Sequence, residues 1–543
     1  MSPLSPMSQF SSVYHAFEES AARFAERPFL RAPAIATTDY ADAAITLTYA
    51  ETRRQAMGLA AAYASRGIKQ NDRVAVAFDA RLDVYLHLLA LNAVGASIVP
   101  LNSSASDSEI FYVIDHSDSR LVVSADEHLD RLKLVAGDHD DCPAIGIREL
   151  DVTAEYSAAG GAGLAAEAAL LYTSGTTGKP KGCMLSNEYF LAIGIWYNGL
   201  GGICSMDSHD RLLTPLPPNH MNALATSFVA MMLCGGCVIQ LDRFHPRSWW
   251  QTAREENVTI IHCLGVMVAM LLTLPETDND DFAGQITFCF GPGSDPRHQA
   301  IFEQRFGFPL VEAWAMTETG AGAMTIADKE PRNVGERCIG KPAETMEFRV
   351  VDEQDHDVVV GESGELLVRA KGGEPRAGFF SGYYKDEKAT EEGWKGGWWH
   401  TGDVVRQGPD GSLYFVDRRK NVIRRSGENI AAVEVEAVLL RRNEVHHCAV
   451  CPVPDEIRGD EVFAFVVSPG DVEADDALAH DLFAHCLQHL TYFKAPGYIA
   501  FVDALPLTAS QKVSRGDIKT MARQRLKSGG FTDLRHLKKR NKT

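Results

Sequence analysis

The sequence predicts an α/β protein: a large N-terminal domain of helix-covered parallel sheets with a β-rich subdomain, followed by a small, mobile α+β C-terminal domain. Three observations support this fold class. Short apolar runs typical of buried strands alternate with helix-like stretches over the first 330 residues. From about residue 334, glycine turns separate short strands, and from about residue 420 the pattern is mixed. A chain of 543 residues also exceeds what one compact core supports, which predicts at least two domains.

The N-terminal domain is predicted to span residues 1–419. Its first clear element is a helix that the capping box Thr48–Glu51 opens and Gly67 can close. Strands are predicted at 73–78 and 120–124, with a helix over 84–94 between them. Further strands at 258–264, 285–290 and 309–314 each lie beside helical stretches. This alternation is typical of parallel sheets covered on both faces.

The β-rich subdomain is predicted at about 334–417, with short strands at 347–352, 364–370, 402–407 and 411–417. Turns such as Pro409-Asp410-Gly411 separate these strands. The C-terminal domain, 420–543, is predicted to contain helices at 431–442 and 475–490 and strands at 447–453, 461–467 and 498–502. No internal repeat interrupts this order.

The composition narrows the class of protein. A net charge of −19 argues against nucleic acid as a partner. No apolar run approaches the length of a membrane span, and the first ten residues lack the features of a secretory signal. Eleven cysteines without framework spacing fit a reducing cytoplasm. We therefore expect a cytoplasmic enzyme or binding protein with small-molecule partners.

Two segments, one with the spacing of metal ligands and one rich in positive charge, are each interpreted as ordinary structure. Cys448 and Cys451 form a C-x-x-C, but the segment reads as a buried strand and has no second ligand pair, so we expect no metal there. The stretch from Arg523 to Thr543 holds eight lysines or arginines and one acid. We expect it to be a solvated, frayed end.

The most informative segment is Tyr172–Gly182, YTSGTTGKPKG. Glycines let successive backbone N–H groups converge on an anion, while hydroxyls and lysines add donors and charge. This is what a loop for polyphosphate requires. It is not a Walker A motif, because Pro180 follows Gly178-Lys179 where Ser or Thr is needed. The candidate ATP ligands of the segment are Thr173, Ser174, Gly175, Thr176, Thr177, Gly178, Lys179 and Lys181.

The order S-G-T-T-G-K-P-K-G resembles the phosphate-binding signature of the adenylate-forming superfamily, which includes acyl-CoA synthetases, adenylation domains and luciferases. The resemblance implies a two-step reaction. ATP and a carboxylate give an acyl adenylate and pyrophosphate, and a thiol, usually that of coenzyme A, then takes the acyl group. It therefore implies ATP, Mg²⁺ and coenzyme A as cofactors.

Further motifs follow in the family's order. EAWAMTETG (312–320) resembles the adenine and magnesium segment. The resemblance places Trp314 on the purine, Thr317 on the α-phosphate and Glu318 on Mg²⁺. A core aromatic is the alternative role for Trp314. WWHTGDVV (398–405) resembles the ribose segment, so Asp403 would accept the ribose hydroxyls and Arg418 would contact ribose or phosphate.

The C-terminal motifs imply roles in each half-reaction. Lys420 matches the family's hinge, and Gly427, Glu428 and Asn429 lie in the turn associated with the thioester step. Lys512, in PLTASQKVSR, matches the catalytic lysine between the carboxylate and the α-phosphate. The other basic residues near the hinge are expected to form a solvated charged face: Arg419, Arg424 and Arg425.

The acyl pocket is the least readable part of the sequence. His220, in LPPNHMNA, matches an aromatic or histidine gate and belongs to the predicted catalytic set with Thr317, Glu318 and Lys512. GPGSDP replaces the family's usual G-x-A-P, which would reshape the pocket. The predicted pocket residues are His220, Met221, Asn222, Gly265, Val266, Gly291, Pro292, Gly293, Met316, Gly320 and Ala321.

The segments RRSGENIAAVEVE (424–436) and GKPAETMEFRVVDE (340–353) look most like bacterial ligases of the crotonobetaine/carnitine type. We predict an ATP-dependent carboxylate–CoA ligase for a small or medium acid. Two alternatives remain. One is an adenylating enzyme that passes the acyl group to a separate carrier protein, and the other is a catalytically inactive nucleotide-binding adenylation fold. We also expect no nucleic-acid partner, and a possible homodimer.

Overall fold

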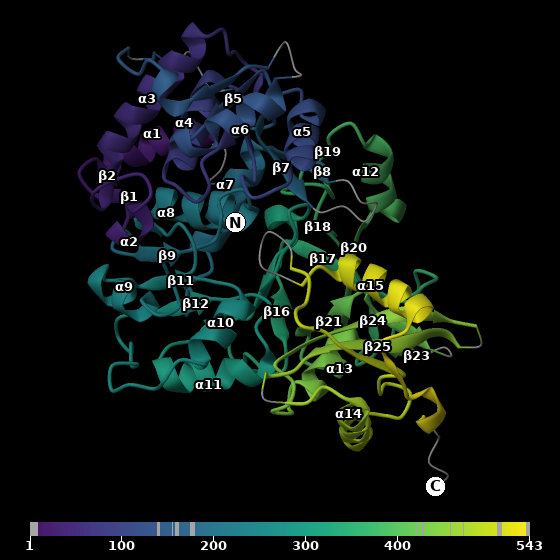
Figure 1. The fold of residues 1–543 in the computed structure, drawn as a ribbon. Helices are drawn as coiled ribbons and strands as arrows, with labels where there is room; N and C mark the ends of the chain where they lie inside the picture. Colours follow the sequence, from purple (N-terminus) through teal and green to yellow (C-terminus); the bar gives the residue numbers. More distant parts are fainter. Residues whose placement is uncertain are drawn as a thin grey trace. The chain divides into compact units, whose positions relative to one another are not determined.

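A computed structural model describes residues 9–137, 142–154, 156–157, 162–173, 180–419, 421–425, 428–456, 458–470, 472–507 and 513–538 (Figure 1). The chain divides into two compact units. The first comprises residues 1–348, 367–400 and 410–414, and the second comprises residues 349–366, 401–409 and 415–543. The predicted α/β fold class is confirmed.

The first sheet of unit 1 has the order β13-β12-β11-β9-β10-β1-β2. All neighbours are parallel except β2, and β1, near the start of the chain, lies beside β10, with Leu30 opposite Val238 (Figure 1). Its strands are β1 (Pro28–Ala32), β2 (Ile45–Thr48), β9 (Arg211–Thr214), β10 (Cys237–Gln240), β11 (Ile260–His262), β12 (Phe288–Phe290) and β13 (Leu310–Val311). Four helices follow its strands: α8 (Phe228–Cys234), α9 (Trp249–Glu255), α10 (Gly265–Leu272) and α11 (Pro296–Phe306).

The second sheet has the order β19-β8-β7-β4-β3-β5-β6. Its strands are β3 (Arg73–Ala77), β4 (Ser97–Pro100), β5 (Leu121–Ser124), β6 (Ala144–Gly146), β7 (Glu167–Thr173), β8 (Lys181–Ser186) and β19 (Gly382–Tyr383). The helices are α1 (Val13–Phe24), α2 (Ala34–Thr37), α3 (Tyr49–Ser65), α4 (Asp83–Val94), α5 (Asp107–His116), α6 (Asp126–Ala136) and α7 (Asn187–Asn198). The predicted capping box is present: Thr48 and Glu51 bond each other's backbone N–H at the start of α3.

Two predicted strands of unit 1 differ from the structure. The strand predicted at 285–290 begins only at Phe288, because Gln285 and Ile286 donate to the carbonyl of Phe282 in a turn that includes Gly284 at φ 79°. The strand predicted at 309–314 is divided. Leu310–Val311 joins the first sheet, whereas β14 (Ala313–Trp314) pairs with β15 (Thr325–Ile326).

The β-rich region contains β16 (Cys338–Pro342), β17 (Met346–Val351), β18 (Ser363–Ala370), β20 (Trp399–Gln407) and β21 (Leu413–Arg418), with α12 (Glu387–Gly393) inserted. Residues of this region belong to both compact units, although the sequence assigned all of them to the N-terminal domain. The break at residues 419/420 therefore stays a prediction about which part of the chain moves.

The second unit contains the sheet β23-β22-β25-β26-β27, with β24 paired to β25. The strands are β22 (Ile423–Arg425), β23 (Glu428–Ile430), β24 (His447–Asp455), β25 (Gly459–Val467), β26 (Tyr498–Phe501) and β27 (Thr532–Asp533). Residues of α13 (Ala432–Leu439) and α14 (Asp476–His489) share one apolar core with this sheet, and residues of α15 (Arg515–Ser528) share another.

The C-x-x-C segment is the buried strand that the sequence predicts. Cys448 lies in the core with α13 and α14, whereas Cys451 lies in the core with α15. Residues three apart on a strand face opposite sides of a sheet, so these thiols do not share a ligand site. Burial raises the pKa of the Cys451 thiol to about 12.

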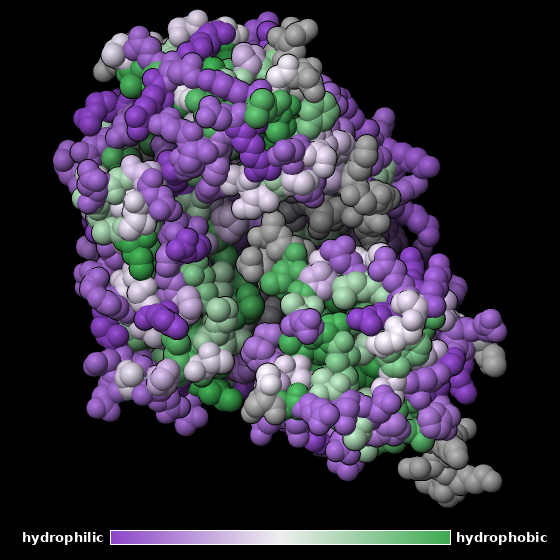
Figure 2. All heavy atoms as spheres, viewed as in Figure 1, coloured by the Kyte–Doolittle hydropathy of each residue, from purple (hydrophilic) through white to green (hydrophobic). Residues whose placement is uncertain are grey.

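The expectation of a frayed C-terminal end is wrong for residues up to Lys538, although Arg523 and Lys527 on α15 are exposed as expected. Thr532 of β27 pairs with Ile499 of β26, and Leu534 is fully buried. Hydrophilic residues predominate on the surface drawn in Figure 2, as the charge of the chain leads one to expect. Within the described ranges, each helix falls short of the length and apolar content needed to cross a bilayer.

Candidate active site

The residues predicted to line the acyl pocket follow the carboxyl ends of four neighbouring parallel strands. β9 ends at Thr214, β11 at His262, β12 at Phe290 and β13 at Val311. The carboxyl ends of parallel strands meet at one edge of a sheet, which is where open α/β sheets bind ligands. The predicted residues follow in this order: His220, Met221 and Asn222 after β9, Gly265 and Val266 after β11, Gly291, Pro292 and Gly293 after β12, and Met316, Gly320 and Ala321 after β13.

Two of these segments pack closely against each other. A Cβ atom at Gly265 would lie 2.0 Å from the carbonyl oxygen of Gly293, so only glycine fits at the start of α10. Gly293 itself has φ 78°, a left-handed conformation that favours glycine. The GPGS sequence, which departs from the family pattern, therefore has a conformation suited to this close contact.

Glu312, which the sequence analysis did not single out, holds the same loop. Its carboxylate accepts hydrogen bonds from the backbone N–H of Gly293 at 2.6 Å and of Ser294 at 3.0 Å. The side chain is buried, and burial raises the pKa of this carboxyl to about 7, although the backbone N–H donors oppose the shift. Its position immediately before Ala313-Trp314 in the EAW motif was the one available sequence signal.

A buried polar network lies beside the segment after β9. His262 Nε2 lies 2.8 Å from the Tyr197 hydroxyl, and His262 Nδ1 lies 2.8 Å from Ser227 Oγ and 3.1 Å from Asn222 Oδ1. Burial lowers the pKa of His262 to about 3, so the ring is neutral. Asn222 and Ser227 are the two ends of a π-helical segment, η3 (Asn222–Ser227), a local geometry common at functional sites.

Both contacts of the Asn222 side chain with this network involve its amide oxygen. Its oxygen is directed at His262 Nδ1, and Ser227 Oγ lies 3.4 Å away from the same oxygen. The contacts with the network therefore leave the amide nitrogen of this half-buried side chain, which can donate two hydrogen bonds, for other partners. No sequence signal pointed to His262, because a single histidine in an apolar run is ordinarily a core residue.

The predicted phosphate segment connects two paired strands. Thr173, the last residue of β7, lies opposite Lys181, the first residue of β8. The predicted ligands between them lie outside the described residues: Ser174, Gly175, Thr176, Thr177, Gly178 and Lys179. The ammonium of Lys181 lies 3.5 Å from Asp386 and 4.7 Å from the centre of the Tyr383 ring.

Glu318 is a buried carboxylate with one neutral partner. The hydroxyl of Tyr383, in β19, donates to Glu318 Oε1 at 2.7 Å. Burial and the nearby carboxylate raise the pKa of Tyr383 well above its ordinary value, so the hydroxyl remains a donor. Tyr383 was missed by the sequence analysis, because only the pairing of β19 with β8 brings it to this motif.

The neighbouring motif residues are held by backbone contacts. The hydroxyl of Tyr189 donates to the carbonyl oxygen of Thr317 at 2.8 Å, and the N–H of Phe380 donates to that of Glu318 at 3.0 Å. Trp314 is 5% exposed on β14. This burial fits a core aromatic as well as a ring with one open face, so its stacking on a purine stays a prediction.

The residues present fit the magnesium that the family implies. Mg²⁺ is usually held by one or two carboxylates together with substrate phosphates. Glu318 supplies a carboxylate in the motif that follows β13 and β14. Among the described residues, the one group of three closely spaced metal-ligand side chains is Asp79, Glu127 and His128, which does not include Glu318. The MTET motif therefore provides one carboxylate, that of Glu318, as a protein ligand for Mg²⁺.

In the second unit, the two predicted ribose ligands are adjacent. Arg418 Nε lies 3.2 Å from Asp403 Oδ1, and Asp403 is buried while Arg418 is exposed. The pair is therefore open to solvent on the side of the Arg418 guanidinium, while the Asp403 carboxylate lies beneath it. The remaining predicted residues of this unit lie outside the described residues: Lys420, Gly427 and Lys512. Glu428 and Asn429 are described only as backbone of β23.

The expectation of a solvated basic face after β21 is wrong for Arg425, whereas Arg419 is exposed and also has a carboxylate partner. Arg419 Nη1 lies 2.5 Å from the buried carboxylate of Glu365. Arg425 is 1% exposed and donates from Nε to Glu461 Oε2 at 2.8 Å. An arginine with a buried carboxylate partner has a structural role that the local sequence does not reveal.

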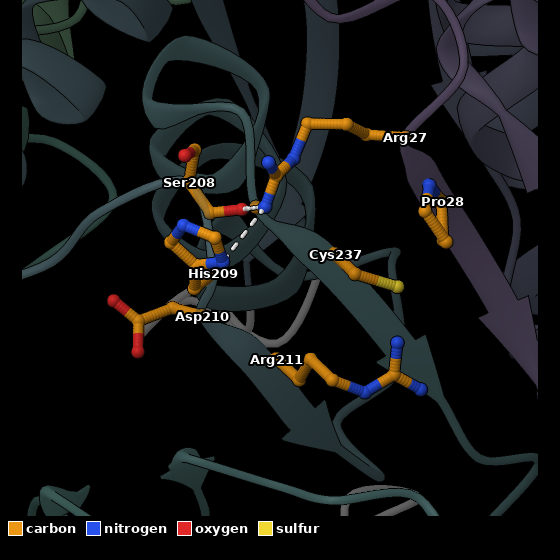
Figure 3. A pocket seen from close by; sticks show the side chains of 8 residues that line it. Arg27, Pro28, Ser208, His209, Asp210, Arg211 and Cys237 are labelled. Atoms are coloured by element: carbon orange, nitrogen blue, oxygen red, sulfur yellow. Dashed lines mark hydrogen bonds between the residues drawn. The ribbon is translucent and has the colours of Figure 1, made fainter.

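A separate cavity of about 140 Å³ lies at the opposite edge of the first sheet (Figure 3). Pro28, Arg211 and Cys237, which line it, are the first residues of β1, β9 and β10. Arg27 crosses it and donates to the carbonyl of Ser208. Because ligands of open α/β sheets bind at the carboxyl ends of strands, this cavity is not a candidate active site.

Comparison with known proteins identifies the family that this geometry fits. The model of the AMP-binding enzyme family matches residues 17–384, and that of the AMP-binding enzyme C-terminal domain matches residues 434–512. The chain belongs to the AMP-binding enzyme family. The resemblance stated from the phosphate segment is thereby confirmed.

Relatives of this AMP-binding enzyme include ligases of small acids. A sulfoacetate–CoA ligase of Cupriavidus necator is 31% identical over 515 residues, covering 91% of this chain and 95% of the relative. A crotonobetaine/carnitine–CoA ligase of Proteus mirabilis is 28% identical over 490 residues, covering 86% and 92%. At the level of reaction class the prediction is confirmed: the protein is an ATP-dependent carboxylate–CoA ligase that forms an acyl-AMP and uses ATP and coenzyme A.

Solved structures share the fold of this AMP-binding enzyme. ATP-bound MatB from Rhodopseudomonas palustris is 21% identical, with a TM-score of 0.81 over 97% of this chain and 100% of that chain. MenE from Bacillus subtilis in complex with ATP and magnesium is 24% identical, with a TM-score of 0.79 over 93% and 99%. At this identity the likeness concerns the fold.

Proposed function

We propose that this ligase activates a small carboxylic acid that carries a second polar or charged group. The observation that carries the proposal is the oriented amide of Asn222. Its oxygen is engaged by His262, so its N–H donors are available to an acceptor group on a ligand. Asn222 follows the carboxyl end of β9, together with the exposed His220.

The relatives support the same substrate class. Sulfoacetate, the substrate named for one relative, has a sulfonate as its second group, and carnitine, named for others, has a quaternary ammonium and a hydroxyl. A buried donor that loses its partner is costly, so a site built around an amide donor discriminates against acids that lack an acceptor. A long alkyl chain would leave this donor unpaired.

In the first half-reaction, a carboxylate oxygen of the acid attacks the α-phosphorus of ATP, and pyrophosphate leaves. We propose that Thr317 and Lys512 stabilise the negative charge that develops there, and that Thr173 to Lys181 hold the leaving phosphates. Glu318 would hold Mg²⁺, which supplies charge neutralisation on the phosphates. Asp403 and Arg418 would bind the ribose, and Trp314 the adenine.

In the second half-reaction, the coenzyme A sulfur attacks the acyl carbonyl, its proton passes to solvent or a base, and AMP leaves. Gly427, Glu428 and Asn429 are proposed for this step. Residues 420–543 would move as a body about Lys420 between the steps, because the described helices and strands of this part of the chain share well-packed cores. A cytoplasmic location, a possible homodimer and the lack of a nucleic-acid partner remain part of this proposal.

A substrate panel tests the acid specificity. AMP release would be measured with ATP, Mg²⁺ and coenzyme A for sulfoacetate, carnitine, straight-chain acids from butanoate to octanoate, benzoate and hexadecanoate. We expect the highest kcat/KM for a short acid with a second polar group. Higher turnover with hexadecanoate than with the short or aromatic acids would contradict the proposal.

Asn222→Ala tests the role of the amide. With the preferred acid the variant should lose about tenfold to a hundredfold in kcat/KM, the effect of one lost hydrogen bond in a specificity site, whereas a plain alkyl acid should be little affected. Asn279→Ala, at an exposed asparagine, is the matched control. Equal losses on both acids in the Asn222 variant would exclude the amide as the specificity determinant.

A further inference from the structure

The basic C-terminal segment ends in a buried ion pair. Lys538 Nζ lies 2.6 Å from Glu461 Oε1, and both side chains are fully buried. The chain is fastened there by the pairing of β27 with β26 and by Leu534 in the core with α13 and α14. A lysine in a tail is ordinarily a solvated charge, so its complete burial requires a structural reason.

The partner carboxylate also binds a second cation. Glu461 Oε2 accepts from Arg425 Nε at 2.8 Å, while Oε1 also accepts from the N–H of Val462 at 2.9 Å. Glu461, in β25, is therefore held on both oxygens between Lys538 and Arg425. The charged partners fix each other's positions, because each would otherwise be an unpaired charge in the interior.

Burial of the Lys538 ammonium group is unfavourable, because it removes a positive charge from water. Desolvation lowers the pKa of Lys538 to about 8, and the neighbouring Arg425 and Arg458 act in the same direction, whereas Glu461 opposes them. One carboxylate thus compensates two fully buried cations. If one of the three charged groups were displaced, the others would be left incompletely compensated in the interior. The cluster is therefore suited to fixing the positions of these residues rather than to adding stability.

Arg425 connects this cluster to a hairpin. It is the last residue of β22, paired with Glu428 of β23 and with Gly459 of β25. We infer that Lys538 is a positioning residue for thioester formation, acting through Glu461 and Arg425 to fix the base of the β22–β23 hairpin. This inference rests on the proposed function, which assigns Glu428 and Asn429 to the thioester step.

The test compares Lys538→Met with Lys527→Met, which removes the same charge from an exposed residue of α15. Adenylation would be measured by pyrophosphate exchange, and thioester formation by acyl-CoA appearance, on the same preparations. Misplacement of a reacting group by about 1 Å costs up to roughly a hundredfold, so Lys538→Met should lose about tenfold to a hundredfold in thioester formation while pyrophosphate exchange stays within about twofold. Lys527→Met should match the wild type in both.

Two further measurements separate positioning from general stability. Amide hydrogen exchange of peptides that cover 423–430 should be faster in Lys538→Met than in Lys527→Met, with peptides of α7 in the first unit unchanged. Lys538→Gln keeps an N–H donor for Glu461, so its loss of thioester formation should be smaller, and it replaces the methionine variant if that variant does not fold. Equal decreases in both half-reactions, or unchanged exchange at 423–430, would overturn the inference.

The hydrogen-exchange comparison uses no substrate, so it distinguishes the two levels of proposal. A wild-type protein that releases no AMP with any acid of the panel would contradict the proposed substrate class and leave the exchange result to decide the inference. A wild-type protein that is active on the panel, combined with unaltered half-reactions in Lys538→Met, would overturn the inference alone.

Discussion

The carboxylate of Glu312 accepts a hydrogen bond of 2.6 Å from the backbone N–H of Gly293, so a residue after β13 holds the loop that follows β12. Gly293 in turn lies against Gly265, the first residue of α10. Three of the four segments at the carboxyl edge of the first sheet are therefore joined by one buried carboxyl and one close backbone contact. The shape of this edge therefore depends on Glu312, which is not among the predicted pocket residues, as well as on the contact between Gly265 and Gly293.

Glu312→Gln should alter the pH dependence of stability. Burial raises the pKa of Glu312 from 4.5 to about 7, so the folded protein binds more protons than the unfolded chain between these values. The contribution of Glu312 is fully present below about pH 4.5 and is lost as the pH rises through about 7. The wild type should therefore lose up to about 3 kcal/mol relative to Glu312→Gln across this range.

Unfolding free energies measured at several pH values would check this, with Glu276→Gln, at an exposed glutamate, as the control. A wild-type minus variant difference that stays constant across the range would show that Glu312 keeps an ordinary pKa. Glu312→Ala, which leaves the N–H groups of Gly293 and Ser294 without this acceptor, should cost about 1–3 kcal/mol at low pH and less as the pH rises through about 7.

Glu318→Gln should raise the magnesium requirement and lower turnover with little effect on stability. A neutral amide is a weaker ligand for a hard cation than a carboxylate. Tyr383→Phe removes the donor at 2.7 Å but keeps the carboxylate, so it should change the magnesium dependence less than Glu318→Gln does. Turnover would be titrated with magnesium, and identical curves for wild type and Glu318→Gln would remove Glu318 from the metal shell.

Lys512→Ala should nearly abolish adenylation and leave thioester formation from supplied acyl-AMP intact. The reason is that a cation matters most where negative charge develops in the transition state, an effect of about a hundredfold to a thousandfold. Pyrophosphate exchange and acyl-CoA formation from synthetic acyl-AMP separate the two steps. Equal losses in a correctly folded variant would show that Lys512 does not have this role.

Lys420→Pro should retain most adenylation and lose most thioester formation. Proline fixes φ near −65° and removes one N–H, which would restrict a hinge to one orientation. Both half-reactions would be measured on one preparation. If the variant is fully active in both, the hinge lies elsewhere or no rotation is required.

Much of the fold was accessible from the sequence because its signals are local. The capping box at Thr48 acts over one helical turn, and the apolar run before Thr173 marks β7 directly. The motif residues Asp403 and Arg418 were identified by the spacing of their motifs, and the structure places them 3.2 Å apart. Local chemistry and motif order were sufficient for the reaction class.

The residues that shape the site depend instead on tertiary contacts. Tyr383 meets Glu318 across 65 positions, and Lys538 meets Glu461 across 77. Apart from Glu318, which its motif identified, each of these side chains reads in the sequence as an ordinary surface or core residue. Burial decides otherwise, since a charge removed from water is stable only beside a partner, and only the folded chain determines which partner that is.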